Sequence, residues 1–156
     1  MSGLGEVNVT SADDNAIGER QVRALVGTLA TAIRDKNHEA LMSHYAPDVL
    51  AFDLLPPLQY SGADAIRKRV SAWFSSFEGS IEFEMRNLNI SAGDDIAFCY
   101  SLNGVTGTSK DGAKVDMWWR ATNCFRKIDG TWLVTHGHSS EPFDMETGKA
   151  LLDLKS

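Results

Sequence analysis

The sequence predicts an α+β domain in which helices come first and an antiparallel sheet follows. Apolar residues recur with helical spacing in the first half of the chain and alternate with polar residues in the second half. Two Asp-Gly pairs, at 111–112 and 129–130, are typical of tight turns between neighbouring strands. Helices followed by hairpin-linked strands indicate antiparallel pairing.

The bulk composition is that of one globular domain. The chain has 156 residues, of which 43% are hydrophobic and 23% charged, and a net charge of −6. Such an acidic chain argues against a nucleic-acid partner, because phosphate binding requires a basic face. No apolar run approaches the roughly 20 residues that span a bilayer, so no membrane partner is expected.

The first residues lack the basic start and apolar stretch of a secretory signal, so we expect a cytoplasmic protein. Residues 1–15 are predicted to form a flexible lead-in, and residues 16–156 a single domain. Cys99 and Cys124 could form a disulfide by count alone, but a reducing compartment favours two small buried thiols.

Three helices are predicted in the first half. The first has an apolar face made by Val22, Leu25, Val26, Leu29 and Ile33. Asn37 suits the N-cap of a short second helix that carries Leu41, Met42 and Tyr45, and Pro47 would end it. The third helix follows "SGAD" at 61–64, which has capping-box spacing. Its apolar stripe consists of Ile66, Val70, Trp73, Phe74 and Phe77.

Four strands are predicted in the second half. The first begins near Ile81, and its apolar phase slips at Asn87, which indicates a bulge. The next strand follows the turn at 92–95 and carries Ile96, Phe98, Tyr100 and Leu102. The last two run from Lys114 to Lys127 and from Trp132 to about Ser140.

Asp53, within "VLAFDLLPPLQY", is the first candidate site residue. Its apolar neighbours predict a partly buried carboxyl group, and burial favours a role as general base. A loop aspartate that faces water beside Pro56 and Pro57 is the open alternative, because acidic residues are seldom buried.

The stretch "MWWRATNCF" at 117–125 supplies two more candidates. Strand alternation places Trp119 and Asn123 on one face, which we interpret as the inner face, and Trp118 on the other. A buried amide at Asn123 needs a partner from the protein, from water or from a ligand. Whether Trp119 lines a site or only packs in the core stays open.

The third candidate is the histidine pair in "THGHSS" at 135–140. In a regular strand His136 and His138 point the same way, together with Val134. Zinc requires three or four ligands and no third lies adjacent, so we predict no metal; Asp53, Glu141 or Cys124 could serve only if the fold brings them close. The pair would either line a pocket or be held structurally by backbone or carboxylate groups.

The order of these elements resembles the nuclear-transport-factor-2-like superfamily, and within it the SnoaL-like and ketosteroid-isomerase-like proteins. The segments that carry the resemblance are "DKNHEALMSHYAPDVLAFD", "YSGADAIRKRVSAWF" and "RKIDGTWLVTHGHSS", of which "DGTWLVTHGHSS" is the most similar to the family. The resemblance covers about residues 16 to 143. It implies a cystatin-like cone, with a strongly curved antiparallel sheet wrapped around N-terminal helices and a pocket at the open end.

The resemblance also implies roles for the candidates. Asp53 falls at the position of the isomerase base, and His136 and His138 fall on pocket-lining positions of the final strand. Asn123 falls near the isomerases' oxyanion acid, and Leu29 replaces their oxyanion tyrosine. Both oxyanion donors are therefore changed, although such donors supply much of the rate.

These observations predict acid–base isomerisation or cyclisation of an apolar, carbonyl-bearing ligand without a cofactor. Asp53, His138 and His136 would be catalytic; the expected substrate contacts are Asn123, Trp119, Tyr60, Phe98 and Trp73. A non-catalytic binding protein and a dimerisation module are the alternatives, and a cone filled by Trp73, Phe77 or Trp119 would favour the module.

A homodimer is expected through the outer face of the sheet. Trp118 is the reason, because an exposed tryptophan on that face favours a covering partner. The alternative is a monomer in which Trp118 lies under Arg126 in a cation–π contact.

Overall fold

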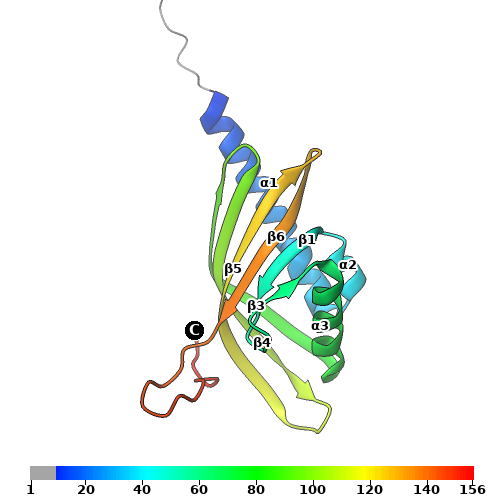
Figure 1. Ribbon diagram of the computed structural model, residues 1–156, viewed down its shortest axis with the longest axis vertical. Coiled ribbons are helices and arrows are strands. Elements are labelled where there is room, and N and C mark those ends of the chain that lie inside the picture. Colours follow the sequence, from blue (N-terminus) through cyan, green and yellow to red (C-terminus); the bar gives the residue numbers. More distant parts are fainter. Residues whose placement is uncertain (1–9) are drawn as a thin grey trace, which may run out of the picture.

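The computed structural model describes residues 10–156. It contains three helices and six strands (Figure 1). The helices are α1 (Thr10–Arg34), α2 (His38–Met42) and α3 (Ala63–Ser75); the strands are β1 (Tyr45–Phe52), β2 (Tyr60–Ser61), β3 (Phe77–Ala92), β4 (Ile96–Ser109), β5 (Lys114–Ile128) and β6 (Thr131–Ser140). The α+β class is confirmed.

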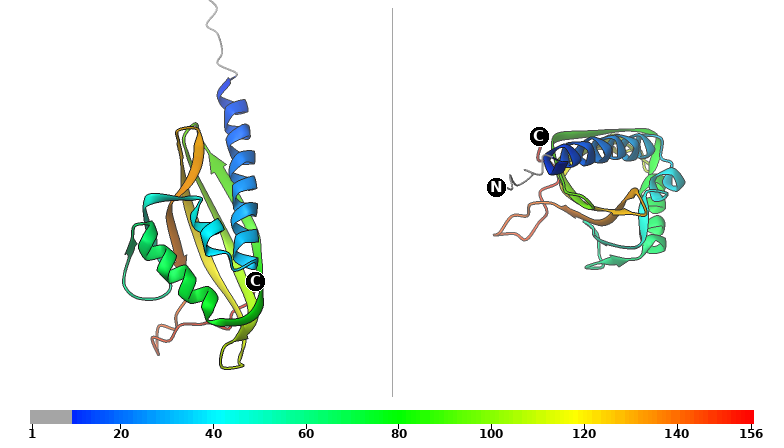
Figure 2. Two further views of the ribbon diagram at one scale, coloured as in Figure 1. Left: turned by 90° about the vertical axis from the view of Figure 1, so that its right-hand side faces the viewer. Right: turned by 90° about the horizontal axis from the view of Figure 1, so that it is seen from above.

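One curved sheet joins the strands in the order β2-β1-β6-β5-β4-β3. All neighbours are antiparallel except β1 and β6, which run parallel. Seen from above, the sheet curves so that strands and helices together form a ring (Figure 2). The expected cone is therefore present, with one parallel pair where the last strand returns beside the first.

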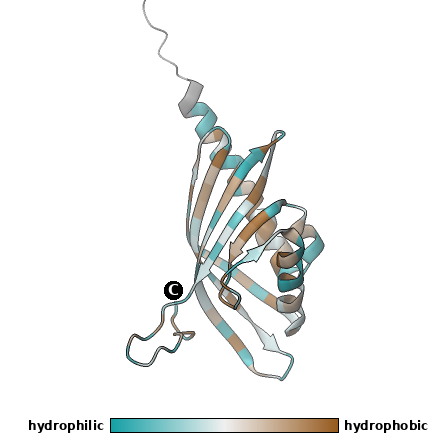
Figure 3. Cartoon of the chain, in the orientation of Figure 1, coloured by the Kyte–Doolittle hydropathy of each residue, from teal (hydrophilic) through white to brown (hydrophobic). Residues whose placement is uncertain are grey.

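The core lies between the sheet and the helices. Helix α1 packs mainly against β3, and α3 packs against β1. Hydrophobic and hydrophilic residues alternate along the strands, as a half-buried sheet requires (Figure 3). The side chains buried most deeply are Phe125, Val22, Val49, Val134 and Cys99.

Helix boundaries differ from the prediction at two positions. Tyr45 opens β1 instead of extending α2, because Val134 N–H donates to the His44 carbonyl and Tyr45 pairs with Val134. Pro47 thus lies inside a strand, and Phe77 opens β3 instead of closing α3. The Asn37 cap is confirmed: its side chain accepts a hydrogen bond from Ala40 N at 3.0 Å.

Two further expectations concern the ends of helices. The "SGAD" segment forms no capping box, because Gly62 is the N-cap of α3 and makes no side-chain bond. Residues 10–15 of the expected lead-in belong to α1, whereas residues 1–9 lie outside the described residues. None of the helices described is both long and apolar enough to cross a membrane.

Both Asp-Gly turns and the Asn87 bulge are confirmed. Asp129 and Gly130 have φ of 50° and 80°, the left-handed pair that a two-residue hairpin turn requires. Asn87 has φ of 55° and lies where the β3–β4 register shifts, between Arg86 and Asn89. A second shift, between β5 and β6, leaves Thr135 unpaired.

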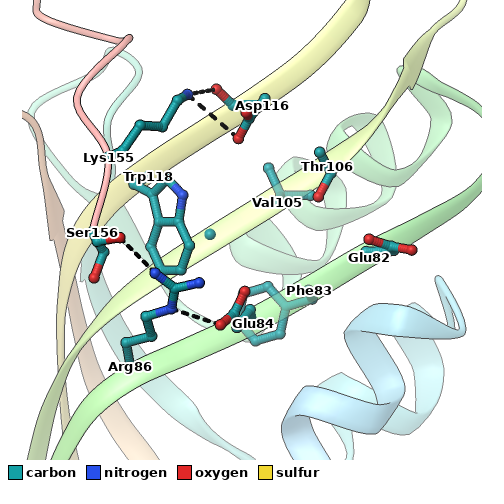
Figure 4. A pocket seen from close by; sticks show the side chains of 11 residues that line it. Glu82, Phe83, Glu84, Arg86, Val105, Thr106, Asp116, Trp118, Lys155 and Ser156 are labelled. Atoms are coloured by element: carbon teal, nitrogen blue, oxygen red, sulfur yellow. Dashed lines mark hydrogen bonds and ion pairs between the residues drawn. The ribbon is translucent and has the colours of Figure 1, made fainter.

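Trp118 lies on the outer face of the sheet and is covered within its own chain (Figure 4). The Arg86 guanidinium lies 4.6 Å from the ring centroid, so the cation–π partner is Arg86 and not Arg126. Lys155 Nζ donates to the Asp116 carbonyl at 2.6 Å, and Arg86 donates to the Ser156 carbonyl. The last residues of the sequence therefore cross the sheet beside Trp118.

Gly104 makes room for this ring. A Cβ at Gly104 would lie 2.6 Å from Cε2 of Trp118, which is closer than two non-bonded carbon atoms approach each other. We predict that Gly104→Ala destabilises the fold by about 1–3 kcal/mol, because the indole ring of Trp118 must move away from its present position. Urea denaturation measures the change.

Gly27→Ala is the matched control, since a Cβ at Gly27 meets nothing within 4 Å in the middle of α1. This control should gain about 0.5–1 kcal/mol from helix propensity. A Gly104→Ala variant within about 0.5 kcal/mol of the parent would show that Trp118 is not fixed in this position.

Candidate functional site

Strand β6 contains one extra residue, Thr135, and this residue determines which side chains of β6 face the interior. Val134 pairs with Phe125, but His136 pairs with Cys124, so Thr135 has no partner on β5. Paired residues of antiparallel strands point to the same side, so the phase of β6 reverses at this bulge. Gly137 therefore faces inward, and a Cβ there would lie 3.1 Å from Oδ1 of Asn123.

The prediction that the two histidines point into the cone is wrong for this reason. His136 and His138 lie on the outer face, where both rings contact Phe52 edge-on at centroid distances of 4.8 and 5.4 Å. His136 Nδ1 lies 2.7 Å from the Leu50 carbonyl, a backbone partner on the neighbouring strand. His138 is exposed.

Strand β4 also shows the opposite phase from the one its apolar residues indicated. Ala97, Cys99, Ser101 and Asn103 are buried, whereas Phe98 is 44% exposed and stacks on Tyr100 across the outer face. Phe98 therefore does not line the interior. From Ala97 to Asn103, the inner face of β4 is built from small and polar side chains.

Asp53 lies on the inner side together with these residues. It follows β1 directly, in the strand phase of Ala51, which pairs with Gly137. If the register continues by one step beyond Phe52, Asp53 lies beside Ser139, which pairs with Ala121. Small residues thus separate Asp53 from the centre of the sheet.

Asp53 forms an ion pair with Arg69 of α3. Nε of Arg69 lies 2.8 Å from Oδ2, and Nη2 donates to Oδ1 at 3.4 Å. The Leu54 N–H also donates to Oδ1. The two side chains are only 18% and 22% exposed, for Arg69 and Asp53 respectively. Asp53 is neither an isolated buried acid nor a freely hydrated loop residue: its carboxylate is held by a cation that sequence reasoning missed.

Two polar pairs line the inner face farther from Asp53. Asn123 of β5 lies opposite Cys99 of β4. Burial raises the pKa of the Cys99 thiol to about 11, against smaller opposing effects of hydrogen bonds from Asn123, so this thiol is protonated at neutral pH. The Ser101 hydroxyl donates to Oδ1 of Asn103 at 2.7 Å, and both residues are buried.

Aromatic side chains fill one end of the interior. The rings of Trp73 and Trp119 meet edge-on at 6.1 Å, and Phe77 and Phe83 contact them at similar distances. Of the predicted contacts, Trp73, Trp119 and Asn123 therefore share the inner side with Asp53. Tyr60 packs partly buried against the same core and donates its hydroxyl proton to the Pro56 carbonyl.

The described residues also contain features outside this interior. A surface hollow of about 510 Å³ lies on the outer face beside Trp118, and one of about 220 Å³ lies beside Trp132. Neither is lined by Asp53 or by a histidine. Residues 10–156 hold no group of three or more side chains suited to a metal ion.

Glu141, which directly follows β6, is an unusual acid that sequence reasoning considered only as a metal ligand. Both carboxylate oxygens are covered, and neither accepts a hydrogen bond from a residue that the structure describes. Desolvation raises the pKa of this carboxyl group, and the positive charge of Arg120 opposes that effect. The raised pKa makes Glu141 easier to protonate than an exposed glutamate.

The fold has close counterparts among solved structures. A nuclear-transport-factor-2-like protein of unknown function from Pseudomonas putida is 33% identical, covers 90% of this chain and 98% of its own, and has a TM-score of 0.82. A candidate scytalone dehydratase from Novosphingobium aromaticivorans is 15% identical, with 93% and 99% coverage and a TM-score of 0.75.

The association domain of C. elegans CaMKII is 18% identical, covers 82% of this chain and 98% of its own, and has a TM-score of 0.65. No curated protein matches the sequence. The SnoaL-like domain family matches residues 22–144, which is most of the chain. Together with the cone and the identity to the Pseudomonas protein, this match shows that the chain belongs to the SnoaL-like domain family.

Proposed function

We propose that the cone binds a small, carbonyl-bearing molecule and that Asp53 removes a proton from a carbon next to the carbonyl group. The observation that carries this proposal is the inner wall beside Asp53. Where a filled core would carry large apolar side chains, this wall carries small residues, namely Ala51, Ser101, Ala121, Gly137 and Ser139.

The exposure of inward-facing residues supports an accessible interior. Asn123, Gly137 and Trp119 are only partly buried although they face the helices. A ligand that enters there would meet apolar rings at the closed end and polar groups along the sheet. This mixture is typical of small-molecule sites.

The chemistry follows from the ion pair. Asp53 forms an ion pair with Arg69, and a carboxylate is the form that accepts a proton. Removal of the α-proton leaves the bonding electrons on the ligand as an enolate, which takes up the proton again at the same or another carbon. The enolate oxygen requires a hydrogen-bond donor, and the inner face offers neutral amides. His136 and His138 have no role in this proposed reaction. The cytoplasmic location of the protein stays a prediction.

Proton exchange into 2-tetralone, a bicyclic aromatic ketone, tests the proposal. In D₂O the protein should accelerate loss of the α-proton NMR signal over buffer. Asp53→Asn should lower the enzymatic rate by about 100-fold or more, because a positioned base contributes that much. Asp48→Asn, an exposed acid on β1, is the matched control and should keep the parent rate.

Ala121→Leu should block the interior and abolish both binding and exchange. If the parent protein binds 2-tetralone and Ala121→Leu does not, but the parent fails to exchange the protons of the ketone, the protein is a non-catalytic binding protein. Binding that survives Ala121→Leu would contradict an interior site altogether.

A second function, self-association, is favoured by the outer face. Ile96, Phe98 and Tyr100 lie along β4 and are 55%, 44% and 49% exposed, and Phe52 adds a further ring beside the histidines. Exposed aromatic rows of this kind favour an interface. The aromatic end of the cone also agrees with a module whose interior is partly filled. The two functions do not exclude each other, since they use opposite faces.

We predict a homodimer at micromolar concentration, with twice the 17.1 kDa mass of the chain. Phe98→Glu should yield the monomer in light scattering, because a charge at the centre of an apolar interface is costly. Leu58→Glu, at a side chain that is 96% exposed in the β1–β2 loop, should remain dimeric. A monomeric parent protein would rule out this association.

A further inference from the structure

Arg69 of α3 uses only one edge of its guanidinium group to hold Asp53. Nε lies 2.8 Å from Oδ2, and Nη2 donates to Oδ1 at 3.4 Å, so the edge formed by Nε and Nη2 faces the carboxylate. A guanidinium group carries five N–H donors in one rigid plane. The other edge, formed by Nη1 and the second N–H of Nη2, donates to no acceptor among residues 10–156.

This unused edge of Arg69 is open to a small molecule. Nε is covered, whereas Nη1 remains accessible. The side chain as a whole is only 18% exposed, so most of the cation is shielded from bulk water. A charged donor that is accessible on a largely covered side chain forms a stronger hydrogen bond than the same donor in open solvent.

Arg69 lies on the face of α3 that packs against the sheet. It follows the buried Ile66 by three residues and precedes Trp73, whose ring contacts Trp119 of β5, by four. The ion pair holds its guanidinium group at Asp53, on the inner side at the end of β1. The unused edge therefore lies beside the wall of small residues where the proposed ligand binds.

The separation between the carboxylate and the unused edge fits a single ketone. An oxygen that accepts from the second N–H of Nη2, at about 2.9 Å, would lie about 5 Å from Oδ1 of Asp53. In a ketone the oxygen and an α-carbon are about 2.4 Å apart, and an attacking base contacts that carbon at about 3 Å. The Asp53–Arg69 pair therefore reaches the C–H bond and the oxygen of the same carbonyl group.

We propose that the unused edge of Arg69 donates hydrogen bonds to the carbonyl oxygen of the ligand and is catalytic in forming the enolate. This inference rests on the proposed function and deepens it. As Asp53 takes the α-proton, the electrons of the C–H bond form the C=C bond of the enolate, and the π electrons of the C=O bond move to the oxygen. Arg69 keeps its protons, and its hydrogen bonds strengthen as negative charge grows on that oxygen.

The neutral amides of the inner face are less suited to the reacting carbonyl group. In the sheet order β1-β6-β5-β4, Asn123 lies two strands and Asn103 three strands from β1, which Asp53 follows. The donor to the oxygen must lie next to the base, because the α-carbon and the oxygen are only two bonds apart. Arg69 meets this condition because it contacts Asp53 itself.

The test uses 2-tetralone labelled with ¹³C at the carbonyl carbon, because that resonance moves downfield when its oxygen accepts a hydrogen bond. Asp53→Asn removes the base, so the bound ketone stays unreacted and should still show the downfield shift. The double variant Asp53→Asn, Arg69→Met should lose the shift, and this pair of proteins differs only in the guanidinium group. In the presence of Asp53, Arg69→Met should lower the exchange rate by about 100-fold.

Arg67→Met is the matched control. Arg67 lies on the same helix, but its Nη1 lies 2.6 Å from Oε1 of Glu39 on α2. This variant should keep the parent exchange rate and the parent carbonyl shift. If Arg69→Met does not fold, ¹⁵N-labelled arginine in the parent protein carries the test. The ketone should move the Nη signals of Arg69, assigned by their loss in Arg69→Lys, and leave its covered Nε signal in place.

Failure of this proposal differs from failure of the proposed function. A downfield shift that survives in the double variant, or Nη signals that do not move, would overturn the donor role; Arg69 would then only position Asp53. If the shift depends on Arg69 but the parent exchanges no protons, the contact stands and the proposed catalysis fails. No movement of any interior resonance at the solubility limit of 2-tetralone would contradict both.

Discussion

The unpaired residue Thr135 determines what this cone contains. It reverses the phase of β6, so that Gly137 and Ser139 face inward while His136 and His138 face outward. A regular strand would have placed His136 opposite Asn123 and His138 opposite Ala121, where the structure has a glycine and a serine. The glycine beside Asn123 and the outward position of the two histidines both follow from this one irregularity.

Stability alone does not explain the Asp53–Arg69 pair on the inner wall. The removal of each ion from water costs several kcal/mol, and the attraction between the two charges in a partly polar interior returns an energy of similar size. An apolar pair of similar size would serve the fold as well or better. A group retained without a clear gain in stability is more easily understood as part of a site, especially beside small residues and oriented amides.

The sequence indicated several features whose signal is local. The Asp-Gly turns, the Asn37 cap and the slip at Asn87 each depend on a few neighbouring residues, and the structure has all of them. Asn123 and Trp119 were also assigned to the correct side, because β5 follows the ordinary alternation, whereas β1 and β2 were not predicted as strands.

The errors arose where sheet pairing or the environment overrides local pattern. Tyr45 has helical spacing but is drawn into β1 by its pairing with Val134. Phe98 and Tyr100 have large aromatic side chains, yet they lie outside while the small Cys99 and Ser101 are buried, so the rule that large hydrophobic residues face inward fails on β4. The bulge at Thr135 could not be predicted, because no glycine marks it in the sequence. Arg69 becomes a partner of Asp53 only through tertiary packing.

The orientation of the β6 side chains is the most direct test of this account, and nuclear Overhauser contacts in the ligand-free protein measure it. We expect contacts from the His138 ring to Phe52 and Thr122, and from the Gly137 α-protons to the Asn123 side-chain amide. A contact between the His138 ring and the Asn123 or Trp119 side chain would contradict the account, because it would place the histidines inside the cone.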